Sequence, residues 1–205
     1  NTANTEVYDG TSWTEVNNLN TARRNTGAAG TSGSAVFFGG YTTTYVASTE
    51  SWNGTSWTEV ADLNLARNFP GGLGVQTAML FVGGASTLTE PTSLQALTES
   101  WDGTSWTEVN NINTARNKMG ASGITTSGLI FGGSPSAVAL TEKYDGTSWT
   151  EVGDISVAKA FMCGCGTQAA AVLPGGVTGP SSTSNSVTAE VWNDPSYAVE
   201  TVTTS

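Results

Sequence analysis

Four basic residues recur at one position of a repeated segment, and their side chains could bind an anion. They are Arg23, Arg67, Arg116 and Lys159, and they make up four of the seven lysine and arginine residues in the 205-residue chain. Arginine offers two parallel N–H groups to a carboxylate, so such residues converging near a common axis could hold a carboxylate or an acidic glycan. The alternative is a scaffold role, in which each cation pairs with a repeated glutamate or packs over a tryptophan.

Two tyrosines could contact a sugar or a protein surface. The chain has four variable segments, at residues 41–48, 85–98, 134–141 and 177–189. Tyr41 and Tyr45 are the only aromatic residues in them. A tyrosine ring can stack on a sugar while its hydroxyl group forms a hydrogen bond. Variable loops on a rigid scaffold are where recognition is usually found, although they can also be solvated spacers.

The other polar residues do not predict catalysis. The chain has no histidine, which excludes Ser-His-Asp and Cys-His nucleophile activation and histidine-ligated zinc or copper. Catalytic carboxylates are usually singular, whereas one set of glutamates here is as uniform as the repeat itself. That set is Glu6, Glu50, Glu99, Glu142 and Glu190. We therefore expect a non-enzymatic protein that uses neither a metal nor a cofactor.

The two cysteines, Cys163 and Cys165, stand two residues apart. On a strand this spacing places both thiols on one face. We expect them to fill the core as small side chains, and the alternative is a redox pair or a soft-metal site.

A repeat positions all of these residues. Residues 8–16 read YDGTSWTEV, residues 52–60 read WNGTSWTEV, and closely similar strings occupy residues 101–109 and 144–152. A degenerate fifth copy begins at Trp192. The marker residues Trp13, Trp57, Trp106, Trp149 and Tyr197 are separated by steps of 44, 49, 43 and 48 residues. Steps of this size are typical of propeller blades and solenoid units.

Each repeat predicts four short antiparallel strands. Glycine- and alanine-rich segments such as residues 26–30 suit an innermost strand, where large side chains would collide around an axis. A short apolar run ending in a glycine pair follows, and two strands with alternating aromatic and polar residues complete the unit. The Asp-Gly or Asn-Gly between the last two strands predicts a two-residue type I′ turn.

This pattern resembles the kelch repeat of β-propellers. Arg23, the pair Gly39-Gly40, Trp52 and Trp57 occupy the four signature positions, and the match recurs four times. The resemblance implies an all-β, kelch-like β-propeller. It extends to galactose oxidase, whose propeller domain is kelch-built, but that copper chemistry needs histidine ligands, which this chain lacks.

Counting blades predicts one domain over residues 1–205. Four complete four-stranded blades are expected at residues 23–60, 67–109, 116–152 and 159–202. Residues 1–16 supply an outer half-blade, which suggests a five-bladed frame; the alternative is a four-bladed ring with an extra hairpin. We expect the missing inner half to precede Asn1 or to come from another chain, so that the chain is part of a longer protein or an assembly.

Charge and composition limit the partners. The net charge of −10 would repel a phosphate backbone, so we expect no binding to nucleic acid. The longest apolar runs have the length of a strand, so we expect no membrane insertion.

Two functions are compatible with this sequence. In the first, the chain is an extracellular or virion-surface binding module that recognises a glycan or a surface protein through the variable loops on one propeller face. In the second, it is a structural or assembly protein, such as a fibre or decoration protein, whose incomplete blade is completed by another chain. The setting follows from resemblance to kelch-like arrays of phages and environmental microbes.

Overall fold

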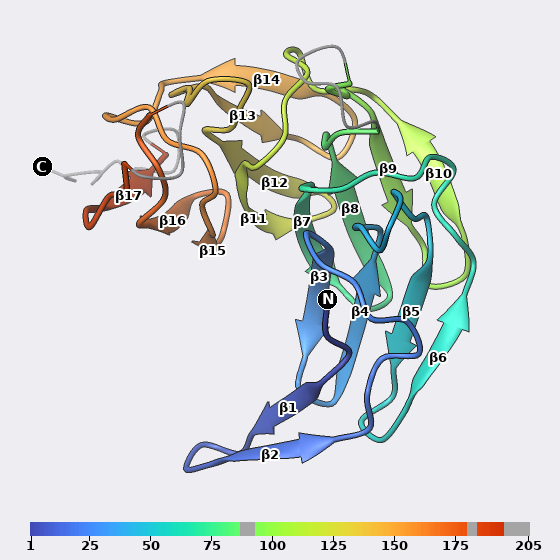
Figure 1. Cartoon of the computed structure of the whole chain (residues 1–205). Helices are drawn as coiled ribbons and strands as arrows, with labels where there is room; N and C mark the ends of the chain where they lie inside the picture. The colour runs from blue at the N-terminus through green and yellow to red at the C-terminus, as the bar shows by residue number, and fades with distance from the viewer. Residues whose placement is uncertain (87–92, 180–183, 195–205) are drawn as a thin grey trace, which may run out of the picture.

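The computed structural model describes residues 1–86, 93–179 and 184–194. These residues form strands and loops and contain no helix, and so no helix that could cross a membrane. Short antiparallel sheets, which we call blades, stand side by side around a curved arc, and the first strand of each blade lies nearest the centre (Figure 1). The all-β propeller expected from the repeat is confirmed.

Three blades have four strands each, paired in chain order. Blade 1 consists of β3 (Gly27–Thr31), β4 (Ser34–Phe38), β5 (Thr49–Trp52) and β6 (Trp57–Val60). Blade 2 consists of β7 (Gly71–Val75), β8 (Ala78–Val82), β9 (Thr98–Trp101) and β10 (Trp106–Val109). Blade 3 consists of β11 (Gly120–Ile124), β12 (Ser127–Phe131), β13 (Thr141–Tyr144) and β14 (Trp149–Val152). All twelve strands lie inside the blades predicted from the repeat.

Blade 4 is described in part. It contains β15 (Cys165–Gly166), β16 (Ala170–Pro174) and β17 (Ala189–Asn193), which pair in that order. The outer strand predicted around Tyr197 lies outside the described residues.

A separate two-stranded sheet precedes blade 1. It pairs β1 (Thr5–Tyr8) with β2 (Trp13–Val16), as expected for an outer half-blade. Trp57 Nε1 donates to Thr5 Oγ1 at 3.1 Å, and Trp106 Nε1 of blade 2 donates to Thr49 Oγ1 of blade 1 at 3.2 Å. The sheet therefore meets blade 1 as blade 1 meets blade 2. Between it and blade 4 the arc formed by residues 1–86, 93–179 and 184–194 is open (Figure 1).

The outer hairpins have four-residue loops, so the predicted type I′ turn is wrong. Trp52 pairs with Trp57, which leaves residues 53–56 in the loop. The side chain of Asn53 accepts hydrogen bonds from the amides of Thr55 and Ser56, both at 2.9 Å. Asn and Asp readily close such local turns, and this side-chain acceptor determines the loop here.

The glycine pairs allow neighbouring blades to approach each other closely. Gly39 has a φ of +62°, and a Cβ there would lie 2.8 Å from the carbonyl oxygen of Arg67. The next amide, that of Gly40, donates to the same oxygen at 2.8 Å. Apolar side chains fill the space between blades: Phe38 of blade 1 packs with Phe81 of blade 2 in one such cluster.

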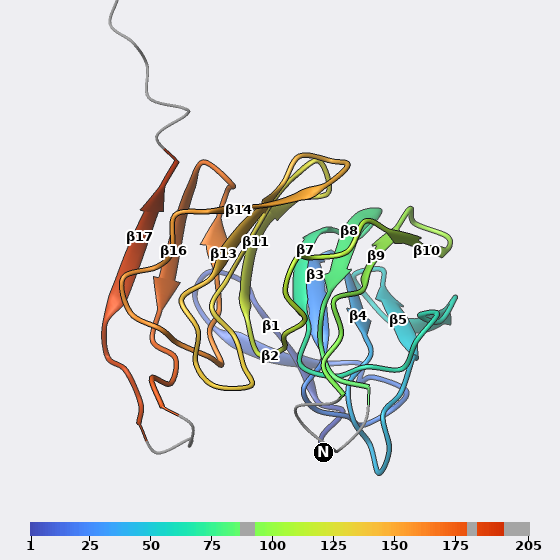
Figure 2. The same ribbon diagram turned by 90° about the horizontal axis from the view of Figure 1, so that it is seen from above.

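The loops that join the second and third strands lie on one side of the arc, as expected (Figure 2). Parts of two of these loops, residues 87–92 and 180–183, lie outside the described residues. We call this side the loop face.

Candidate functional site

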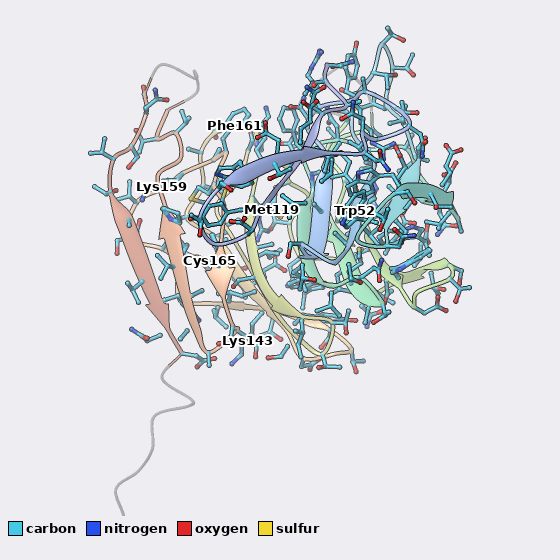
Figure 3. All side chains as sticks on the ribbon, turned by 90° about the horizontal axis from the view of Figure 1, so that it is seen from below. Trp52, Met119, Lys143, Lys159, Phe161 and Cys165 are labelled. Atoms are coloured by element: carbon cyan, nitrogen blue, oxygen red, sulfur yellow. The ribbon has the colours of Figure 1, made fainter. Side chains whose placement is uncertain are left out.

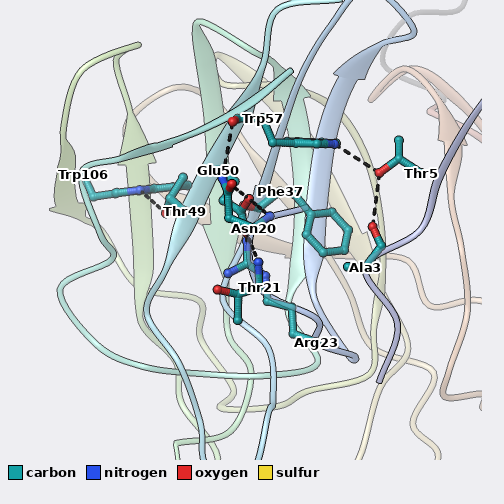
Figure 4. Close-up of polar contacts among 10 residues, drawn as sticks. All are labelled: Ala3, Thr5, Asn20, Thr21, Arg23, Phe37, Thr49, Glu50, Trp57 and Trp106. Carbon is teal, nitrogen blue, oxygen red and sulfur yellow. Dashed lines mark hydrogen bonds and ion pairs between the residues drawn. The ribbon is translucent and has the colours of Figure 1, made fainter. Parts of the chain in front are cut away.

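The four repeated basic residues are buried in ion pairs within their own blades. Their nitrogen-to-oxygen distances to glutamate are 3.1 Å for Arg23–Glu50, 2.5 Å for Arg67–Glu99, 2.5 Å for Arg116–Glu142 and 3.1 Å for Lys159–Glu190. Figure 4 shows the first of these pairs and Figure 3 labels Lys159 in blade 4. All four cations are almost fully shielded from solvent.

Each glutamate also holds the segment that enters its blade. In blade 1, Glu50 accepts hydrogen bonds from the backbone amide and side chain of Asn20, at 2.7 and 2.9 Å (Figure 4). Asn64 and Asn113 repeat both contacts in blades 2 and 3, and the Ser156 amide donates to Glu190 at 2.6 Å in blade 4. The glutamate is therefore a junction between the entering segment and the third strand.

Burial and pairing act in opposite directions on the ionisation of these groups. Burial lowers the pKa of Arg67 below its usual value, while the neighbouring Glu99 carboxylate partly offsets that effect. The pKa of Glu190 is lowered: burial acts to raise it, but hydrogen bonds from Lys159 and the Ser156 amide outweigh burial. The fold therefore favours the ionised form of Glu190, whereas burial of the Arg67 cation has a cost that its pair with Glu99 offsets only in part.

A cavity of about 380 Å³ lies between the innermost strands. Its lining consists of short segments from all four blades, namely residues 28–30, 72–74, 121–123 and 164–166. None of the four basic residues belongs to this lining. An external anion would therefore have to displace a glutamate to reach them, and their contacts match the scaffold alternative considered above.

Tyr41 and Tyr45 form one cluster on the loop face with Arg24, which the sequence did not single out. The two rings meet edge to face with centroids 5.5 Å apart. The Arg24 guanidinium lies over the Tyr41 ring at 4.6 Å, and its Nη1 donates to Asn1 Oδ1 at 2.9 Å. Backbone hydrogen bonds between Arg24 and Tyr41, at 3.1 and 2.9 Å, fix the loop to the frame.

Arg24 differs from the buried cations in its exposure and in its lack of an ion pair within the described chain. It is exposed, and it makes no ion pair with any described residue. The corresponding positions in the other blades are Asn68, Asn117 and Ala160. This departure from the repeat, a basic residue at this position in blade 1 alone, is the signal that could have identified it.

Both cysteines are exposed, so the prediction that they fill the core is wrong. Cys165 pairs with Val172 across the sheet, at a position where blade 2 carries the buried pair Leu73 and Leu80. In blade 2 this face packs against blade 3, whereas in blade 4 it faces the open end of the arc (Figure 3). The exposure therefore follows from the missing neighbour on that side.

Among the described residues no three acidic or cysteine side chains gather as a metal site. No protein-family model and no curated protein sequence matches this chain.

Proposed function

We propose that this chain is a kelch-type propeller that acts as a non-enzymatic binding module in an extracellular or virion-surface setting. Its loop face recognises a glycan or a surface protein. The cluster of Arg24, Tyr41 and Tyr45 supports this proposal most strongly, because it combines two aromatic rings with an exposed guanidinium on a rigid frame. Aromatic faces stack on sugars, and a guanidinium binds carboxylates and sulfates in two-point contacts.

A glycan array that includes acidic sugars tests the proposal. We expect a specific hit whose affinity falls at least about tenfold in Tyr41→Ala, Tyr45→Ala and Arg24→Ala. Tyr8→Ala is the matched control, because Tyr8 is an exposed tyrosine on β1, away from this cluster. A hit that survives all three changes would exclude this cluster as the site. A hit lost instead in a folded Arg67→Lys variant would move the site to the buried cations.

The open arc favours a second candidate function. The chain would then be an assembly protein, such as a fibre or decoration component, whose incomplete blade is completed by another chain. Light scattering of the purified protein distinguishes the two functions, since a strict monomer that binds a glycan supports the first. A complex that forms through the open blade supports the second.

A further inference from the structure

The last blade exposes an apolar row, and the other blades bury the residue at the centre of that row. Cys165, Val172 and Val191 stand opposite one another across β15, β16 and β17, and the two valines are 41% and 67% exposed. The residues equivalent to Val172 are Val36, Leu80 and Leu129, all buried. In blades 1 to 3 side chains of the following blade pack against this central residue.

The other end of the arc lacks the same strands. β1 pairs with β2 on one edge, and the described chain leaves its other edge free. In blades 1 and 2 the tryptophan at the end of the third strand reaches the inner hairpin: Trp52 Nε1 donates to the Ser32 carbonyl and Trp101 Nε1 to the Gln76 carbonyl, both at 2.9 Å. The equivalent residue on β1 is Tyr8, which is 48% exposed.

Glu6 completes the pattern of missing contacts. It is equivalent to Glu50, Glu99, Glu142 and Glu190, and each of these binds the basic residue that opens the inner half of its own blade. Glu6 is exposed and has no ion pair among the described residues. The open blade therefore presents a carboxylate that lacks, within the described chain, the cation with which the repeat pairs it.

A backbone ladder near the centre has two unpaired ends. Asn25, Phe69, Lys118 and Phe161 all have φ values between +51° and +58°. The amide of each later residue donates to the carbonyl of the one before it, at 2.9, 2.9 and 2.7 Å. In the described chain this leaves the Asn25 amide and the Phe161 carbonyl without a partner.

The glycine pairs also lack one backbone contact at the open position. Gly40, Gly84 and Gly133 each donate an amide to the carbonyl of the next blade's basic residue, at 2.8, 3.0 and 2.8 Å. The equivalent amide in blade 4, that of Gly176, has no such acceptor among the described residues.

We infer that the open position binds a β-hairpin of the repeat's inner-half type, supplied by another polypeptide. This inference rests on the assembly function proposed above and specifies its partner. The hairpin carries a basic residue that pairs with Glu6 and whose carbonyl accepts from Gly176. Two residues later, a residue with positive φ joins the ladder. A small-residue strand follows, and its partner, an apolar strand that pairs with β1 and ends in two glycines, completes the hairpin.

A second copy of this chain does not meet these requirements as folded. Each of the four repeated basic residues already pairs within its own blade, and the inner hairpins are built into those blades. The occupant is therefore a separate segment, and its positive charge suits a chain with a net charge of −10.

Calorimetric titration with a synthetic peptide of residues 18–41, the inner half of blade 1, tests this inference on the full chain. We expect one-to-one binding that weakens about tenfold or more when the protein carries Glu6→Gln or the peptide carries Arg23→Gln. Glu151→Gln removes an exposed glutamate of blade 3 and serves as the matched control. Hydrogen exchange should slow in β1 and at Gly176 when the peptide binds.

Three outcomes would overturn the inference. The first is no binding up to about 1 mM peptide. The second is binding whose affinity is the same with and without Glu6→Gln. The third is a self-dimer that protects β1 and Gly176 without peptide, which rejects the hairpin but leaves the assembly function standing. A monomer that neither binds the peptide nor protects these segments in any complex would reject both.

Discussion

At the scale of single residues, the buried ion pairs determine how each blade is held together. A charge removed from water is stabilised only when its partner stays in place, so breaking such a pair costs more than the pair itself contributes. In each blade the same glutamate joins a cation, a strand and the entering segment. The four pairs are therefore scaffold, whereas the exposed Arg24 makes no ion pair with a described residue.

Replacing Arg67 by methionine should lower the free energy of unfolding by about 3–5 kcal/mol, because Glu99 would stay buried without its partner. Urea unfolding monitored by tryptophan fluorescence measures this change. The control is Arg24→Met, which we expect to stay within about 0.5 kcal/mol of the parent chain because Arg24 is exposed. Equal effects of the two changes would contradict a structural role for the buried pair.

At the scale of elements, the outer hairpins depend on one side chain each. Backbone amides two and three residues later donate to Asp9, Asp102 and Asp145, and these hydrogen bonds lower the pKa of each carboxyl below its usual value of 3.8. A carboxyl with a lowered pKa in the folded state stabilises the fold above its unfolded pKa. That stabilisation is lost as the pH falls through the folded value.

Blade 1 provides an internal control, because Asn53 closes the same loop without a titratable group. We expect the free energy of unfolding of Asp145→Asn to fall less steeply than that of the parent chain as the pH drops below about 4. The reverse change, Asn53→Asp, should make the fall steeper. Chemical unfolding at a series of pH values measures both slopes, and unchanged slopes would exclude these carboxyls from acid unfolding.

The strands could be predicted from the sequence more fully than the turns and the candidate site. Twelve strands, their order and the outer half-blade follow from the repeat, since alternation and turn residues are local properties. The type I′ turn was wrong because Asp-Gly alone does not reveal that the Asp side chain captures two amides. The cysteines were misplaced because exposure at Cys165 depends on a neighbouring blade, and Arg24 was missed because its partner Tyr41 is brought to it by the fold.

At the scale of the whole molecule, the position of a residue along the arc decides its contribution to stability. Trp13 and Trp106 occupy the same position of the repeat. Trp13 is 66% exposed on the first sheet, whereas Trp106 is buried between blades 1 and 2 against Phe38 and Phe81. Repeat proteins gain much of their stability from such contacts between neighbours.

Trp106→Ala should therefore cost about 3–5 kcal/mol of unfolding free energy, and Trp13→Ala less than about 1 kcal/mol. Denaturant unfolding followed by far-ultraviolet circular dichroism measures both variants without relying on the tryptophan signal. When the inner-half peptide is bound, Trp13→Ala should lower the unfolding free energy by more than it does without the peptide. Similar losses for both variants without peptide would mean that Trp13 is already covered in solution.

The backbone ladder gives the molecule a direction. Every amide in it donates towards the N-terminal blade, so the two ends of the arc are unlike: one end lacks an acceptor and the other lacks a donor. Contacts between unlike ends are heterologous, and they form a closed ring only when the rotation per unit completes a full turn. The hairpin inferred above would have to satisfy both ends at once, with an amide that donates to the Phe161 carbonyl and a carbonyl that accepts from the Asn25 amide. A hairpin that does so would close the ring within one molecule and leave no end for another copy.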